Sequence, residues 1–290
     1  MHRHPPTRAI FLLVLLLAAL PGLGRAAVRV FVTVQPQAWL AERVGGDVVG
    51  VETLVAPGQS PHTFEPRPHQ VEQLMEADLF WRTGMPFEDA WLGKIRATNP
   101  RMAVLDAREG IDLLPEPHHG DDHGHVHGGS DPHLWTSPRV AKRMAAGLAQ
   151  ALARIDPAHS GQYAANLARL TADLDALDRE IASTLEPLRG RRFLVFHPAW
   201  GYFADAYGLT QVAVERGGKE PGPKTLAQLA DDARRSGIRT VFVQPQFSQR
   251  IAETLAAGIG GRVVVLDPLA KDYPESLRAA ARALAEAESR

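Results

Sequence analysis

The longest periodic segment of the chain is AHSGQYAANLARLTADLDALDREIASTLE, residues 158–186. Its apolar side chains recur at steps of three and four, which places them on one face of a continuous helix. These side chains are Tyr163, Leu167, Leu170, Leu174, Leu177, Ile181 and Leu185. At 1.5 Å per residue such a helix spans roughly 43 Å, and Pro187 ends it. A helix of this length in the middle of a chain is expected to join two lobes.

Short strand patterns alternate with helix patterns on both sides of this segment, and this alternation predicts parallel sheets covered by helices on both faces. The expected strands are 28–34, 48–55, 79–82 and 102–105 before the long helix, and 192–196, 211–215, 239–243 and 262–266 after it. We therefore predict a two-lobed α/β protein. Its N-terminal α/β lobe comprises residues 27–157, its linking helix 158–188 and its C-terminal α/β lobe 189–290.

The composition excludes several classes of protein. With 290 residues, 45% hydrophobic and 22% charged, the chain can bury a large core, so it is not a disordered chain, a collagen or a coiled-coil rod. The formal net charge of −1 provides no general basic field, so nucleic acid is not an expected partner. Because there is no cysteine, disulfides, iron–sulfur clusters and thiolate metal sites are excluded.

Residues 1–26 have the pattern of a secretory signal peptide. Arg3 and Arg8 precede an apolar run at residues 9–20, which is shorter than the ~20 residues of a membrane-spanning helix. Small residues at Gly24 and Ala26 place the expected cleavage after Ala26. The alternative is an uncleaved membrane anchor, but no cysteine follows that could make a lipoprotein. We expect an exported protein that is free in the periplasm.

Three polar residues follow predicted strands, at the edge of a parallel sheet where ligands usually bind, and a fourth, His133, ends a long loop just before a predicted helix. They are His62, His133, His197 and Asp267. Three imidazoles and one carboxylate suit a tetrahedral divalent ion, with zinc the first choice, and binding should weaken below about pH 6 as the imidazoles take up protons. Each residue also has an ordinary alternative, since a histidine after a strand is often simply hydrogen-bonded and Asp267 before Pro268 can stabilise a turn.

A histidine-rich loop at residues 116–130 precedes His133. Residues 116–133 read EPHHGDDHGHVHGGSDPH and hold six of the twelve histidines of the chain. Besides His133, these are His118, His119, His123, His125 and His127. Alternating imidazoles on a flexible segment can chelate one ion, so we predict a second, weaker metal site here. A solvated low-complexity insert is the alternative. Glu215 and Glu220 flank a glycine-rich turn, where we expect a structural role. The alternative is that they support the metal ligands through hydrogen bonds or act in a hinge.

Four ordered segments resemble those of the metal-binding solute receptors of bacterial ABC importers. They are PGQSPHTFEPRPHQVEQLMEADL (57–79), DPHLWTSP (131–138), FLVFHPAWGYFADAYGL (193–209) and VVVLDPLAKDY (263–273). The resemblance covers nearly the whole chain after residue 26. It implies two α/β lobes with limited hinge motion and a metal ion at their interface, held by His62, His133, His197 and Asp267. It also implies a monomer that does no chemistry on the metal and delivers it to an inner-membrane permease with a cytoplasmic ATPase.

The same resemblance indicates Zn(II). Manganese and iron members of the family often have a carboxylate at the third ligand position, where this chain has His197, and zinc members often have a loop rich in histidine and acidic residues. Pro61 stands where some zinc receptors have an acidic residue, so Asp267 or water must be the fourth ligand. The nearest alternative is a manganese or iron receptor.

Two more distant alternatives belong to other functional classes. A secreted zinc hydrolase would need an open coordination position and a general base, whereas four ligands are expected here and there is no HExxH motif. A surface adhesin on the same fold would need an anchor, which the sequence does not offer.

Overall fold

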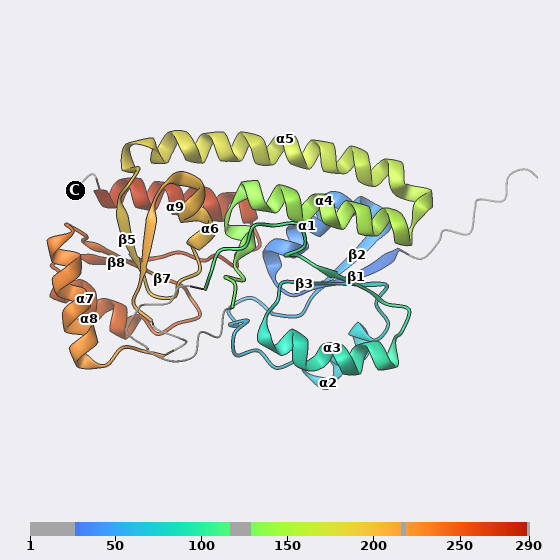
Figure 1. The fold of residues 1–290 in the computed structure, drawn as a ribbon, viewed down its shortest axis with the longest axis horizontal. Helices are drawn as coiled ribbons and strands as arrows, with labels where there is room; N and C mark the ends of the chain where they lie inside the picture. The colour runs from blue at the N-terminus through green and yellow to red at the C-terminus, as the bar shows by residue number, and fades with distance from the viewer. Residues whose placement is uncertain (1–26, 117–128, 216–218, 289–290) are drawn as a thin grey trace, which may run out of the picture.

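The structure, a computed structural model, describes residues 27–116, 129–215 and 219–288. Two α/β lobes lie side by side, and one long helix, α5, runs across both of them (Figure 1). The predicted two-lobed α/β architecture is confirmed. The predicted signal peptide and the five histidines of the loop at 118–127 lie outside the described residues. Within the described ranges, no helix combines the length and the apolar character needed to cross a membrane.

The N-terminal lobe is built on a parallel sheet with the strand order β2-β1-β3-β4. Its strands are β1 (Val28–Val32), β2 (Val49–Thr53), β3 (Leu79–Arg82) and β4 (Ala103–Asp106). Successive side chains of β1 and β3 enter different cores because a strand alternates its faces. Val30 and Trp81 pack with α1 (Gln35–Gly45) and α4 (Pro138–Ile155), whereas Phe31 and Phe80 pack with α2 (Pro68–Leu74) and α3 (Pro86–Thr98). Figure 1 shows α2 and α3 on the opposite side of the sheet from α1 and α4.

The C-terminal lobe repeats this arrangement with the strand order β6-β5-β7-β8, again all parallel. Its strands are β5 (Arg192–Val195), β6 (Thr210–Ala213), β7 (Thr240–Val243) and β8 (Arg262–Val265). Helices α7 (Pro223–Arg235) and α8 (Gln249–Gly258) pack on one face of this sheet, while α6 (Gly201–Tyr207) and α9 (Tyr273–Glu288) belong to the core on the other. In both lobes the first strand therefore lies between the second and the third, and the carboxyl ends of the strands share one edge.

Helix α5 (Ser160–Leu185) connects the lobes. Six members of the predicted apolar stripe are buried, and Leu167 is half-buried. Asn166 is also buried, because its Nδ2 donates to the carbonyl oxygen of Val44 at 2.9 Å, at the end of α1. Ion pairs join α5 to α4 through Lys142 and Asp175 and to α9 through Arg278 and Glu180. The helix thus packs on elements of both lobes and shares one continuous core with them.

Candidate metal centre

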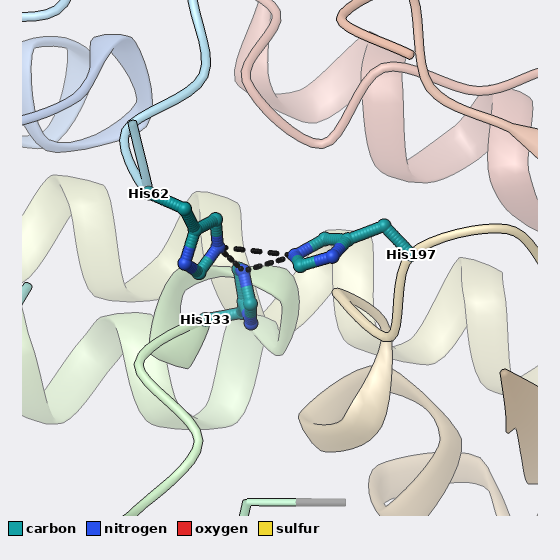
Figure 2. A group of neighbouring side chains, drawn as sticks. All are labelled: His62, His133 and His197. Atoms are coloured by element: carbon teal, nitrogen blue, oxygen red, sulfur yellow. Dashed lines mark hydrogen bonds between the residues drawn. The ribbon is translucent and has the colours of Figure 1, made fainter. Parts of the chain in front are cut away.

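Three histidines from different parts of the chain converge between the lobes. The Nε2 atom of His62 lies 3.1 Å from that of His133 and 3.0 Å from that of His197, and the remaining pair is 3.3 Å apart. Figure 2 shows the three rings pointing toward a common centre. Among the described residues, this is the group of histidine and carboxylate side chains whose geometry could hold a metal ion. His133 and His197 are buried, whereas His62 is exposed.

The fold brings these rings together through loops at the carboxyl ends of strands. His62 lies in the loop between β2 and α2, His133 directly precedes the single 3₁₀ turn before α4, and His197 follows β5 by two residues. In the first loop the rings of Phe64 and Phe87 meet edge to face at 5.1 Å, which anchors that loop on α3.

The geometry of the triangle suits an ion better than a set of hydrogen bonds. His133 Nδ1 lies 2.7 Å from a carboxylate oxygen of Asp131, and His197 Nδ1 lies 3.3 Å from one of Glu215. Because a carboxylate accepts, each Nδ1 carries the proton, and each Nε2 then presents a lone pair to the centre. Two lone pairs cannot hydrogen-bond to each other. A tetrahedral zinc ion with bonds of about 2.0–2.1 Å to nitrogen requires nitrogen separations of roughly 3.3–3.4 Å, close to those found.

The environment favours the uncharged form of two of these imidazoles, His62 and His197. Burial, together with the neighbouring rings of His133 and His197, lowers the pKa of His62 to about 2. Burial also lowers the pKa of His197, and the Glu215 carboxylate opposes this shift. Only unprotonated imidazole binds a metal ion, so these shifts leave the site ready to bind at neutral pH.

Aromatic and amide side chains hold the ligand rings in place. The ring of Phe247 stacks on His197 with centroids 5.0 Å apart, and Trp135 meets His133 edge to face at 5.5 Å. Gln244 donates from Nε2 to the His197 carbonyl oxygen at 2.8 Å and accepts from the His197 backbone N–H at 3.3 Å. The pocket around the three rings encloses about 270 Å³, part of it open to solvent.

Asp267 does not join this group. Its Oδ1 accepts hydrogen bonds from the backbone N–H of Leu269 at 3.0 Å and from Gln246 Nε2 at 3.2 Å, as expected of an aspartate that stabilises a turn before proline. The next two residues, Pro268 and Leu269, do line the pocket. The structure therefore brings together three of the four predicted ligands, and metal binding by Asp267 stays a prediction.

The sequence did not single out Asp131, and for Glu215 it favoured a structural role. A signal for Asp131 was its place two residues before a predicted ligand in DPHLW. The signal for Glu215 is the register of neighbouring strands. Val195 pairs with Ala213 in parallel β5 and β6, so the residues two positions further on, His197 and Glu215, leave the sheet side by side. Finding that signal requires knowing which strands pair.

Comparison with known proteins gives one consistent result. Residues 30–287 match the family model ZnuA, described as the periplasmic component A of a zinc-uptake complex. The high-affinity zinc uptake system protein ZnuA of Paracoccus denitrificans is 32% identical over an alignment 319 positions long, gaps included, which covers 93% of this chain and 94% of that protein. Two crystal structures are 41% identical. One is a ZnuA (TM-score 0.84, covering 90% of this chain and 99% of that one). The other is a zinc-bound deletion mutant of ZnuA (TM-score 0.83, covering 90% and 98%).

Proposed function

We propose a zinc site and a transfer route for this chain, which belongs to the ZnuA family of periplasmic zinc-uptake components. The chain is a zinc-binding receptor of an ABC importer, and the family consists of solute-binding proteins rather than enzymes. This membership argues against a secreted zinc hydrolase, the alternative from another class.

The zinc ligands in our proposal are His62, His133 and His197, through their Nε2 atoms. The observation that carries the proposal is the triangle of these three atoms, with edges of 3.0–3.3 Å. Neutral imidazole is a good ligand for zinc, whereas manganese prefers oxygen donors. The fourth position would be filled by water or by Asp267 after a change in its turn.

Three further parts of the proposal concern the rest of the chain. Residues 1–26 act as a cleaved signal peptide, which agrees with the periplasmic location in the family's description. The histidines at 118–127 bind zinc weakly and supply it to the central site. The monomeric receptor delivers its ion to an inner-membrane permease driven by a cytoplasmic ATPase.

The test is metal stoichiometry and competition on the chain from residue 27 onward. We expect one tight zinc per chain, which excess manganese does not displace, together with weaker sites. Replacing residues 118–127 by a Gly-Ser linker should remove the weak sites and leave the tight one. The loop can be shortened there because its base is already closed by a bridge between Pro115 and Ser130.

The variant His197→Ala should lower the zinc affinity by orders of magnitude, because it removes one of three nitrogen donors. His69→Ala, which changes an exposed histidine on α2, is the matched control and should bind like the wild type. Loss of tight binding on loop replacement would contradict the proposed location of the site. A preference for manganese over zinc would contradict the proposed ion.

A further inference from the structure

Two buried carboxylates lie directly behind two of the candidate zinc ligands. Asp131 is 1% exposed and Glu215 is 6% exposed. In the described part of the chain, neither carboxylate forms an ion pair with lysine or arginine. Each contacts instead the Nδ1 atom of a histidine ring, which carries a charge only when it is protonated. A buried carboxylate that lacks a cation is strongly disfavoured. The positions of both carboxylates are therefore those expected if a positive ion binds on the Nε2 side of the two imidazoles.

Asp131 holds His133 at two points. Its Oδ1 accepts from the backbone N–H of His133 at 2.9 Å and from Nδ1 of the same residue at 2.7 Å. Its backbone carbonyl oxygen accepts from the Tyr202 hydroxyl of the other lobe at 3.2 Å. The backbone and the side chain of Asp131 are thus both fixed, and the His133 ring is fixed with them.

The second oxygen of Asp131 is confined as well. Oδ2 is buried and accepts no hydrogen bond from the described residues. It lies against Gly201 at the start of α6, where a β-carbon would stand only 2.4 Å from it. A glycine is therefore required for the carboxylate to keep this position.

Glu215 plays the corresponding role in the C-terminal lobe. Its backbone N–H donates to the carbonyl oxygen of Phe196 at 2.9 Å, which fixes it beside the start of the His197 turn. From there its Oε2 reaches His197 Nδ1 at 3.3 Å. Among the described residues, no side chain is hydrogen-bonded to His62 Nδ1, so the support is confined to two of the three rings.

We propose, building on the proposed zinc site, that Asp131 and Glu215 are positioning residues that aim the Nε2 atoms of His133 and His197 and supply the charge that neutralises the ion. Three neutral imidazoles leave the two positive charges of Zn(II) uncompensated, and the two carboxylates bring two negative charges. With water as the fourth ligand, the site is then neutral without any carboxylate in contact with the metal. Carboxylates hydrogen-bonded to ligand imidazoles also raise their basicity, which strengthens binding to zinc.

The test compares zinc affinity in Asp131→Asn, Asp131→Ala and Glu215→Gln, measured by competition with a chelator. We expect each substitution to weaken zinc binding by roughly 10–100-fold, the usual effect of losing such a partner. Asp131→Ala should be the weaker binder of the first two, because asparagine can still accept from His133 Nδ1. Nitrogen NMR of the rings should show the Nδ1–H tautomer for His133 and His197 in the metal-free wild type and its loss for His133 in Asp131→Ala. A merely structural role would leave that tautomer unchanged.

Asp205→Asn, which changes an exposed acid on α6, is the matched control and should bind zinc like the wild type.

A second kind of variant leaves both carboxylates in the chain. Gly201→Ala should weaken binding by displacing Asp131 Oδ2, whereas Gly93→Ala, which meets no atom within 4 Å, should not. The test remains decisive if an Asp131 variant fails to fold, because Glu215→Gln and Gly201→Ala probe the same inference.

The same experiment separates this inference from the zinc site on which it rests. If His133→Ala binds zinc as tightly as the wild type, the proposed site itself is wrong. If His133→Ala loses zinc while Asp131→Asn, Glu215→Gln and Gly201→Ala keep full affinity, the site stands and the role of the carboxylates is overturned.

Discussion

At the scale of single residues, the lowered pKa values of His62 and His197 make the stability of the metal-free protein depend on pH. In the unfolded chain His62 takes up a proton near its ordinary pKa of 6.5, whereas in the folded protein it does so only near about 2. The pKa of His197 is shifted in the same direction. Between these values the unfolded state binds more protons, so the free energy of unfolding falls as the pH is lowered below 6.5.

Denaturant unfolding of the metal-free protein at several pH values between 7.5 and 5 tests this prediction. We expect the midpoint to fall with pH in the wild type and to fall less in His62→Gln, which lacks one of the responsible groups. Equal pH dependence in the two proteins would contradict it. Zinc should raise the midpoint at every pH without removing this pH dependence, because the folded protein already holds these imidazoles unprotonated and the protons are taken up by the unfolded chain.

Some residues of the candidate site could be predicted from the sequence and others could not. The difference lies in the structural information that is needed to place each residue in the pocket. His62 and His197 follow strands and His133 ends the histidine-rich loop; the rule that ligands bind beyond strand ends made them candidates, and the resemblance to metal receptors joined them into one predicted site. Glu215 depends on which strands are neighbours, a property of tertiary packing that no local pattern contains. Asp267 also follows a strand, but its carboxylate bonds within its own turn, and local sequence cannot decide between these two roles.

At the scale of elements, α5 should carry much of the stability and little of the metal chemistry. Leu177 is 2% exposed and belongs to the core shared by the lobes. Leu177→Ala should lower the free energy of unfolding by about 2–5 kcal/mol, the usual cost of such a cavity. Denaturant unfolding should detect this loss, while Arg179→Ala, exposed on the same helix, should change little. A large loss of zinc affinity in folded Leu177→Ala would contradict the separation of the two roles.

The hydrophobic periodicity of the sequence predicted the helices and strands well, but the contacts between these elements could be identified only in the structure. The stripe on α5 was visible because burial of one helix face imposes steps of three and four. The burial of Asn166 was not, since a polar residue enters the interior only where a partner is free, here the Val44 carbonyl oxygen at the end of α1. Which helices cover which face of each sheet likewise follows from the pairing of strands rather than from any local pattern.

At the scale of the whole molecule, hydrogen bonds next to the candidate site join the two lobes. The indole N–H of Trp135 donates to the Pro268 carbonyl oxygen at 2.8 Å, and the Tyr273 hydroxyl donates to the Trp135 carbonyl oxygen at 2.8 Å. On the other side of His133, the Tyr202 hydroxyl accepts from the Leu114 N–H and donates to the Asp131 carbonyl oxygen. The segment that carries His133 is thus bonded to the opposite lobe on both sides, which favours small rather than large movements of the lobes when zinc binds.

The bond from Tyr273 to Trp135 allows this view to be tested. Tyr273→Phe leaves the buried Trp135 carbonyl oxygen without that donor, so we expect it to lower the free energy of unfolding by about 1–3 kcal/mol. Because Trp135 packs on His133, the same change should also speed the dissociation of zinc, measured by stopped-flow transfer to a chelator. Tyr207→Phe is the control, since it removes a hydroxyl that donates to Asp178 on α5 and should affect stability alone. If both variants release zinc at the wild-type rate, the bonds between the lobes stabilise the fold without controlling the site.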